Sequence, residues 1–271
     1  MNLDLFTVAP GEKPLDNLKA ACGFAGIFKE IGIIGDSLSS GEFESQDEEG
    51  NTLYHDMYEY SWSAILERLT GTVYRNYSRG GMTAKEYLES WADQNGFWQW
   101  NQAYIIALGN NDIFGANQPA GSVADIHPED PAANPDTFLG DMGRIVSRLK
   151  TMEKDARIFL VSMQRRGEEQ ADATICAIAD EMKKMCGLFS YTYLIDMAHD
   201  GPAYDEEMRK SFAMGGHPNA MGYYVYAMMI GNYMDYIIRE NPKDFFEVPF
   251  IGKGYKNRDI ERCGTEGGKE T

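Results

Sequence analysis

Five short apolar runs, separated by longer stretches of helical periodicity, constrain the fold of this chain most. The apolar runs fall at residues 31–35, 72–76, 103–109, 157–163 and 191–197. Helical periodicity falls at residues 58–69, 83–93, 137–152, 168–186 and 218–239. Strands that are apolar throughout are typical of parallel sheets covered by helices on both faces. The alternation therefore predicts a doubly wound α/β domain.

One domain accounts for these elements, and we place it at residues 31–245. Residues 1–30 are then an N-terminal extension whose role the sequence leaves open. Residues 246–271 form a C-terminal tail that we expect to be partly disordered. Residues 115–136, rich in Pro, Ala and Asp, follow the third apolar run and are expected to be a surface excursion. The apolar residues Met221, Tyr224, Val225 and Met228 recur at helical spacing and are predicted to face the core.

The formal net charge of −17 limits the partners of the chain. Nucleic acid and anionic membrane surfaces repel so acidic a protein. Part of the charge lies in residues 42–49, which we interpret as a solvated loop that would disfavour anionic substrates if it bordered the site. We expect no membrane span. The absence of a signal-peptide pattern at the N-terminus favours a cytoplasmic location, and the alternative is an exported protein whose leader has been removed. The oligomeric state cannot be read from the sequence.

Polar residues follow the predicted strands at points that should meet along one edge of the sheet. Ser37 follows the first strand, Gly81 the second, Asn111 the third, and His217 precedes the last helix. A serine hydroxyl becomes nucleophilic when a histidine takes its proton, and a glycine N–H and an asparagine amide can stabilise an oxyanion. These residues predict acyl transfer. The mechanism needs no metal or other cofactor, and the four cysteines show no metal-binding spacing.

The motifs IIGDSLSSG, RGGMT, LGNND and GHPNAMGY resemble, in order, the blocks of the SGNH hydrolases, also called the GDSL esterase and lipase family. The resemblance covers residues 31–240. It implies a flavodoxin-like three-layer α/β/α fold with five central parallel strands. It also implies an acyl-enzyme on Ser37, His217 as the base, and an oxyanion hole formed by the N–H groups of Ser37 and Gly81 and the side chain of Asn111.

Some of these residues have alternative interpretations. Gly80 rivals Gly81 as the donor, and Asn111 could instead cap a helix. Asp36 and Asp112 are expected to hold the loop backbone rather than to carry protons. His55 and His127 are assigned no role.

The sequence departs from the family pattern at the acidic residue that orients the catalytic histidine and balances its positive charge. The family has an aspartate three residues before it, where this chain has Met214, and a thioether cannot balance an imidazolium. The candidates for the ring's partner are the backbone carbonyl of Met214, Asp196, and a carboxylate from the loop containing Asp200, Asp205, Glu206 and Glu207. Asp196 and His199 match Asp-x-x-His by letter, but they lack the Pro-Asn and the final helix that follow His217, so we favour His217 as the base.

Several functions fit these residues. The leading hypothesis is a serine esterase that removes a small acyl group, such as acetyl, from a neutral carbohydrate or similar small molecule. A lipase or thioesterase of the same family is the nearest alternative, followed by a catalytically impaired binding protein, which only Met214 favours. A phosphate or nucleotide binder is disfavoured because GDSLSSG lacks the lysine and spacing of a P-loop. The aromatics in NGFWQW are assigned to the core.

Overall fold

A central sheet of five parallel strands organises the computed structural model, which describes residues 6–255. The strand order is β4-β1-β5-β6-β7. These strands are β1 (Glu30–Gly35), β4 (Val73–Asn76), β5 (Ala103–Ala107), β6 (Arg157–Val161) and β7 (Thr192–Ile195). Every neighbouring pair is parallel. The predicted strands and the doubly wound α/β fold are therefore confirmed.

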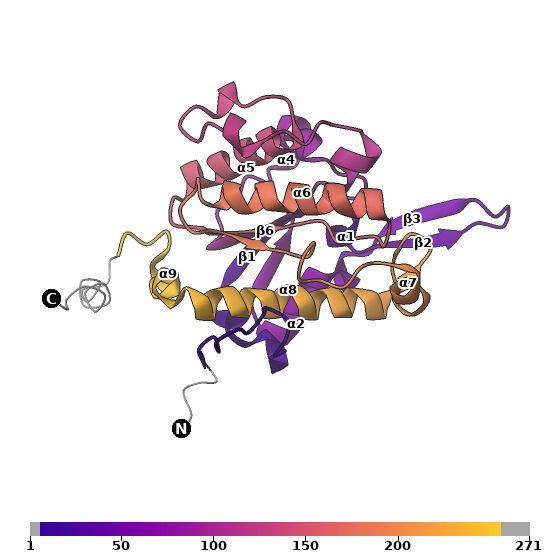
Figure 1. Ribbon diagram of the computed structural model, residues 1–271, viewed down its shortest axis with the longest axis horizontal. Coiled ribbons are helices and arrows are strands. Elements are labelled where there is room, and N and C mark those ends of the chain that lie inside the picture. Colours follow the sequence, from indigo (N-terminus) through magenta and orange to yellow (C-terminus); the bar gives the residue numbers. More distant parts are fainter. Residues whose placement is uncertain (1–5, 256–271) are drawn as a thin grey trace.

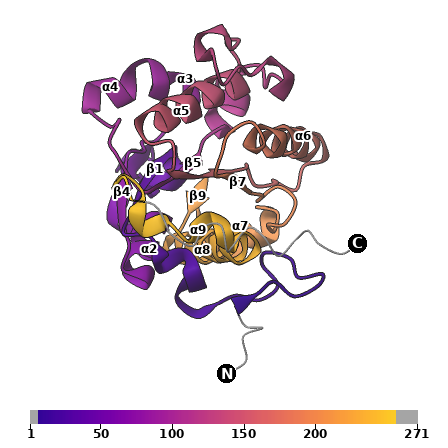
Figure 2. The same cartoon turned by 90° about the vertical axis from the view of Figure 1, so that its left-hand side faces the viewer.

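Helices cover the sheet on both faces, which gives three layers (Figures 1 and 2). One face carries α2 (Trp62–Thr70), α8 (Ala220–Glu240) and α9 (Pro242–Phe245). The other carries α3 (Ala84–Glu86), α4 (Ala92–Asn95), α5 (Phe138–Met152) and α6 (Glu169–Cys186). Helix α3 continues through a π-helical turn, Tyr87–Trp91, into α4. No helix within residues 6–255 combines the length and apolarity needed to cross a membrane.

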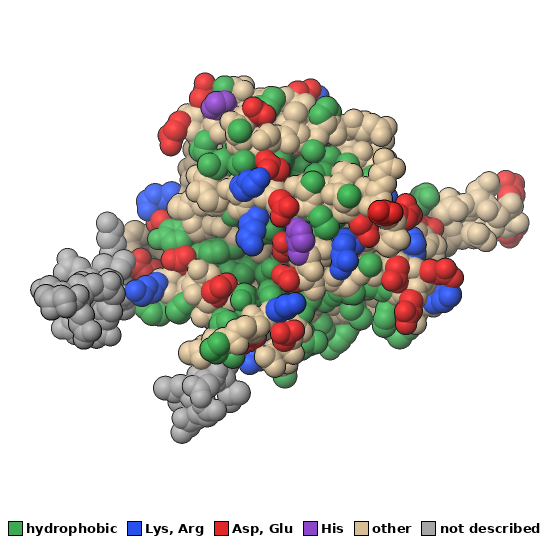
Figure 3. Space-filling view, viewed as in Figure 1, with side chains coloured by type: hydrophobic (Ala, Val, Ile, Leu, Met, Phe, Trp, Pro, Cys, Tyr) green, Lys and Arg blue, Asp and Glu red, His purple; other side chains and the backbone are tan. Residues whose placement is uncertain are grey.

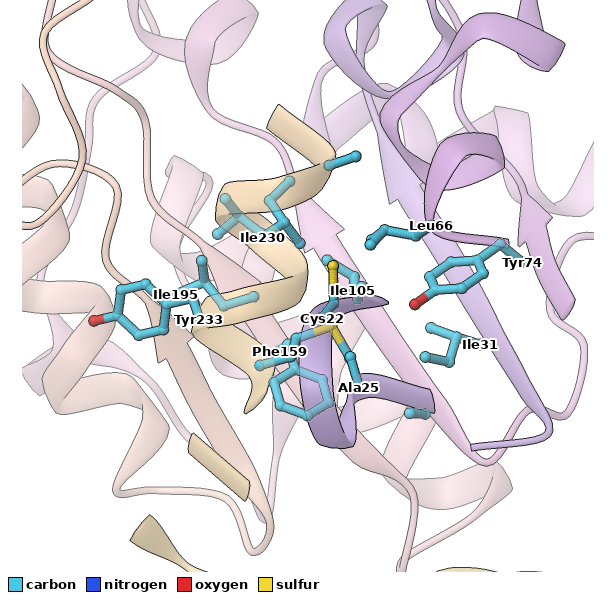
Figure 4. Packing of buried hydrophobic residues seen from close by; sticks show 14 of the residues in the cluster. Cys22, Ala25, Ile31, Leu66, Tyr74, Ile105, Phe159, Ile195, Ile230 and Tyr233 are labelled. Atoms are coloured by element: carbon cyan, nitrogen blue, oxygen red, sulfur yellow. The ribbon is translucent and has the colours of Figure 1, made fainter. Parts of the chain in front are cut away.

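Alternate side chains of the strands enter two separate cores. Ile33 and Ile105 belong to the cluster that packs against α2 and α8, whereas Ile34 and Ile106 belong to the cluster beneath α5. Figure 4 shows the first cluster, where strand residues meet side chains of both helices. A strand buried on both faces has no polar side to present, which explains why its sequence is apolar throughout.

Helix α8 buries a different face from the one we predicted. Met221 and Tyr224 are 60% and 47% exposed, and the other two members of the predicted stripe are half-buried. The fully packed side of the helix carries Tyr223, Ala227 and Ile230 instead. The helix is apolar over most of its circumference, so periodicity alone could not select the buried face.

Residues outside the predicted domain contribute to the same core. The turn-rich segment Ala20–Ile27 packs against α8, and Cys22 and Ala25 are fully buried. At the other end, Val248 and Ile251 are buried. We predicted partial disorder for the C-terminal tail, residues 246–271. Residues 256–271 of that tail lie outside the described residues.

Two short hairpins and a helix stand at the edge of the sheet beyond the carboxyl ends of its strands. Strands β2 (Glu42–Gln46) and β3 (Thr52–Asp56) form an antiparallel hairpin that projects from the body (Figure 1). The prediction of a solvated loop is therefore wrong for residues 42–46, which pair as a strand. Helix α7 (Glu206–Phe212) leads into the second hairpin, β8 (Ala213–Met214) and β9 (His217–Pro218).

Candidate active site

Ser37 is the first residue of α1 (Ser37–Ser40), which begins directly after β1. Gly35 makes this sharp turn possible, because a Cβ there would lie 2.2 Å from the Ser39 hydroxyl and 3.0 Å from the Ala107 carbonyl oxygen. The carboxylate of Asp36 accepts the N–H of Leu38 at 3.1 Å. Ser37 is thereby fixed at the carboxyl end of β1.

Asp36 and Asp112 hold backbone in the loops around the site, as predicted. Asp112 accepts the N–H of Ala84 at 2.7 Å and so ties the loop after β5 to the start of α3. Burial raises the pKa of Asp36 to about 7 and that of Asp112 to about 6, because an ionised carboxylate loses hydration inside the protein.

His217 lies on β9, where two glutamates of β2 face its ring. The ring Nδ1 is 2.7 Å from a carboxylate oxygen of Glu44, and the same oxygen accepts the N–H of Gly216 at 2.7 Å. The ring Nε2 is 3.1 Å from a carboxylate oxygen of Glu42. All three side chains are largely buried, with between 12% and 18% of their area exposed.

Glu44 is therefore the hydrogen-bond partner of the His217 ring Nδ1, a role for which the sequence suggested other residues. Asp196 bonds His199 instead, with 2.9 Å between its carboxylate and the ring Nδ1. Met214 pairs with His217 in the β8–β9 ladder, but its carbonyl is not the partner of the ring. The loop carboxylates at 200 and 205–207 are likewise not bonded to the ring Nδ1.

A signal for Glu44 is present in the sequence, although we did not predict its role. In the run EFESQ, the apolar Phe43 separates two glutamates, and the period of two in a strand places Glu42 and Glu44 on one face. Gly215 completes the fit: its φ is +69°, and a Cβ there would lie 1.9 Å from the Glu44 carboxylate.

Glu42 has an unusual setting among acidic neighbours. Burial raises its pKa, the positive charge of His217 opposes that effect, and the charges of Asp56 and Glu44 add to it. Asp56 is itself hydrogen-bonded to the hydroxyl of Ser40 and the N–H of Gly80. A proton on Glu42 or on His217 satisfies the contact between them.

Ser37 and His217 line the same cavity, which has a volume of about 270 Å³. The cavity lies at the carboxyl ends of β1, β5 and β6, the region where open α/β sheets bind ligands. Its other lining residues are Asp36, Leu38, Ser39, Trp62, Ala107, Leu108, Asn110, Val161, Ser162, Met163, Gln164, Arg166, Glu168, Met197, Tyr204, Arg209, Gly216, Tyr226 and Ile230. The structure thus brings the two principal predicted residues together.

The two other predicted oxyanion donors lie beside each other, next to this cavity wall rather than on it. The side-chain amide of Asn111 donates to the carbonyl of Met82, the residue after Gly81, at 3.1 Å. The φ of Gly81 is +72°. The neighbouring Gly80 donates its N–H to Asp56, so its donor is already used. Among the described lining residues, Asn110 is present whereas Gly81 and Asn111 are not.

No group of three or more potential metal ligands occurs within the described part of the chain. The aromatics of NGFWQW pack as core residues: Phe97 and Trp98 lie against the cluster beneath α5, and Trp100 lies against the opposite one.

Solved structures share this fold at low sequence identity. A G-D-S-L family protein from Desulfitobacterium hafniense DCB-2 is 16% identical, with a TM-score of 0.51, over 76% of this chain and 99% of that one. A family two carbohydrate esterase from Clostridium thermocellum, solved with cellohexaose, is 14% identical with a TM-score of 0.54. A family 2 carbohydrate esterase with a carbohydrate-binding domain, from Corynascus thermopiles, is 17% identical with a TM-score of 0.51. This chain matches 64% of the length of each esterase, through 78% and 75% of its own.

The family assignment comes from the sequence match. Residues 33–225 match the GDSL-like Lipase/Acylhydrolase family, and they include Ser37 and His217. No curated protein sequence matches the chain. The chain therefore belongs to the GDSL-like lipase and acylhydrolase family, and it is a hydrolase of ester bonds.

Proposed function

We propose that the protein is a serine esterase in which Ser37 forms an acyl-enzyme, His217 is the base and Glu44 orients the base. The observation that carries the proposal is the shared cavity of Ser37 and His217, together with the carboxylate of Glu44 on the ring Nδ1. A ring that donates its Nδ1 proton to Glu44 is held in the tautomer whose Nε2 accepts a proton. A carboxylate at this position also stabilises the imidazolium that forms during catalysis.

The chemical steps follow from this arrangement. The Nε2 of His217 takes the proton of Ser37, whose oxygen attacks the ester carbonyl carbon. The imidazolium returns the proton to the departing alcohol as the C–O bond breaks. Water, deprotonated by the same ring, then attacks the acyl-enzyme and releases the acid. Glu42 shares Nε2 in the free protein, so this contact has to give way to Ser37 before the first step.

The family match supports three donors for the oxyanion of the intermediate. These are the N–H groups of Ser37 and Gly81 and the side-chain amide of Asn111. In the free protein the Asn111 amide is bonded to Met82, so the proposal requires it to exchange that bond for the oxyanion. Donors already held near the reacting carbon lower the barrier because they need little reorganisation.

The proposed substrate is an ester of a short acyl group, such as an acetyl group on a carbohydrate. A cavity of about 270 Å³ lies at the small end of the range for ligand sites, which favours short acyl chains. The likeness to carbohydrate esterases is consistent with a sugar as the alcohol. A series of 4-nitrophenyl esters from acetate to dodecanoate tests this: rates should fall with chain length, whereas rates that rise with it would favour a lipase or thioesterase.

Covalent labelling tests the nucleophile directly. An alkyl fluorophosphonate should add one phosphonyl group per chain, and fragmentation of the modified peptide should place the group on Ser37. Ser37→Ala should abolish both labelling and hydrolysis of 4-nitrophenyl acetate. Ser45→Ala is the matched control, since Ser45 also contacts a histidine, His55 at 2.8 Å, but on the exposed hairpin. Labelling that persists in Ser37→Ala, or a folded wild-type protein that cleaves no ester, would contradict the proposal.

A further inference from the structure

We infer that the cavity contains a subsite for an anionic group, built around Arg166 and Arg209, so that the preferred ester carries a carboxylate close to its reacting carbonyl. The inference rests on the proposed esterase function and names its substrate class. It departs from the neutral substrate that the net charge of the chain suggested.

Arg166 is held in place with most of its hydrogen-bonding capacity unused. Its guanidinium lies 3.9 Å from the ring centroid of Phe114 and donates to the side-chain oxygen of Asn110. A guanidinium has five N–H groups, so this one bond leaves several free. No carboxylate within residues 6–255 forms an ion pair with Arg166.

Arg209 reaches the same cavity from helix α7. Its guanidinium lies 5.8 Å from the ring of Tyr204, and it too lacks an ion-pair partner in the described part of the chain. The hydroxyl of Tyr204 is buried and has no hydrogen-bond partner among the described residues, although Tyr204 lines the cavity. Buried hydroxyls are normally hydrogen-bonded, so this one is available to donate to a group bound in the cavity.

Hydrogen bonds join the two loops that form the side of the cavity carrying Arg166, Tyr204 and Arg209. The N–H of Tyr204 donates to the carbonyl of Arg165 at 2.6 Å, and the side chain of Arg165 donates to the carbonyl of Gly201 at 3.1 Å. The amide of Gln164 donates to the carbonyl of Pro202 at 2.6 Å. These bonds join the loop after β6 to the segment before α7, so the two arginines are presented on a braced surface.

Charges of both signs surround Arg166. Burial lowers the pKa of Arg166, the negative charges of Glu168 and Asp172 oppose that effect, and the positive charge of Arg209 adds to it. Two cations that share a cavity repel each other, and a bound carboxylate relieves that repulsion. Glu168 also lines the cavity as a competing negative charge, but it does not pair with Arg166 within 4 Å.

The acidic surface of the protein does not prevent this local preference. Much of the negative charge is remote from the cavity: acidic side chains gather, for example, at the tip of the projecting β2–β3 hairpin (Figure 3). At physiological salt the field of an exposed charge is screened within about 8 Å. Remote carboxylates therefore act weakly on a bound group that contacts two arginines.

Matched pairs of esters test the subsite and locate the anion. The first pair is 4-nitrophenyl pentanoate and the 4-nitrophenyl hemiester of glutaric acid, which place a methyl or a carboxylate at the end of the acyl chain. The second pair is an acetylated methyl glucoside and the corresponding acetylated methyl glucuronoside, which place the charge on the alcohol. The readout is the ratio of kcat/KM for the charged ester to that for the neutral ester.

In the wild-type protein at low salt we expect a ratio of about ten or more for one of the two pairs. Arg166→Gln and Arg209→Gln should each lower that ratio about fivefold, and 0.5 M NaCl should lower it as well. Lys210→Gln is the control: it removes one positive charge from the same helix, but Lys210 pairs with Glu206 and is 69% exposed. Its ratio should match that of the wild type.

The outcomes separate the subsite from the reaction. Neutral esters cleaved with a ratio near or below one in both pairs would overturn the subsite and leave the esterase standing. A high ratio that survives in both arginine variants, or that Lys210→Gln lowers equally, would also overturn it. Failure to cleave any of the four esters by folded wild-type protein would instead overturn the esterase function.

Discussion

Two histidines in this molecule are each hydrogen-bonded to a carboxylate, but only His217 lines the cavity that contains Ser37. The ring Nδ1 is 2.7 Å from Glu44 at His217 and 2.9 Å from Asp196 at His199. His199 obtains its acid from three residues away, in the spacing typical of the family, whereas His217 obtains its acid from 173 residues away.

The surroundings of the two pairs differ more than their geometry. The side chain of His199 is 41% exposed and faces Asp180 of helix α6 at 3.9 Å. The side chain of His217 is 18% exposed and lines the cavity with Ser37. An acid–histidine pair is thus easy to make within one turn of the chain. The cavity that it shares with Ser37 distinguishes His217 from His199, and each of the following experiments tests the proposed consequence of that difference.

Removing each ring in turn should give the largest effect. His217→Ala should lower kcat/KM for 4-nitrophenyl acetate about 10³-fold or more, because Ser37 loses its base. His199→Ala removes the other paired ring and should leave the rate within about twofold of wild type. The assay is steady-state ester hydrolysis, with circular dichroism to confirm folding. Equal losses in the two variants would mean that the cavity does not distinguish the pairs.

Neutralising the distant acid should give the next largest effect. Glu44→Gln keeps an oxygen beside the ring but removes the charge that balances the imidazolium, so kcat should fall about 10–100-fold. Glu48→Gln makes the same change at the exposed end of the hairpin and should leave kcat unchanged. A purely structural role for Glu44 would lower the melting temperature without changing kcat of the folded protein at a temperature where it remains native.

Moving the acid to the local position should recover part of that loss. Met214 is the direct cross-strand partner of His217, and such partners have Cβ atoms about 5 Å apart. In a Glu44→Gln background, Met214→Asp should raise kcat about five- to tenfold, and Met214→Asn should raise it far less because it adds no charge. Identical rates for the two double variants would show that the ring cannot use an acid from this position.

Removing the second carboxylate should give the smallest effect, on pH dependence. Burial raises the pKa of Glu42, and wherever Glu42 is ionised its negative charge favours a proton on the Nε2 of His217. In Glu42→Gln the ring should therefore lose its proton more readily. The acid limb of the kcat/KM profile should move to lower pH by about half to one unit. A shift to higher pH would mean that Glu42 aids rather than delays the base.

Local patterns in the sequence predicted the sheet and the position of Ser37, the proposed nucleophile. The strands are apolar because they are buried on both faces, so composition alone revealed β1 and β5. Gly35 ends β1, and Asp36 and Ser37 follow it directly, so the strand end fixes their location without knowledge of distant contacts. The ordered motifs added His217, which lies immediately before the well-marked helix α8.

The carboxylate partner of His217 could not be predicted from any local pattern, because Glu44 lies 173 residues away in the chain. Glu44 meets the ring only because β2 and β9 lie side by side, and the antiparallel pairing of β2 with β3 was hidden in a run that looked like a charged loop. The arginines were missed for a related reason. Arg166 lies in a loop and Arg209 on a short helix, and only the bonds between these segments bring both to one cavity.

The division of the histidine's support between separate segments also bears on how such proteins are recognised. A search that requires an acid three residues before the histidine would pass over His217 and would accept the His199 motif in its place. Positions 44 and 214 are far apart in the chain, yet Glu44 bonds the ring of His217 and Met214 pairs with His217 across the β8–β9 hairpin. The carboxylate that bonds a histidine can therefore come from a distant strand instead of from the segment that carries the histidine.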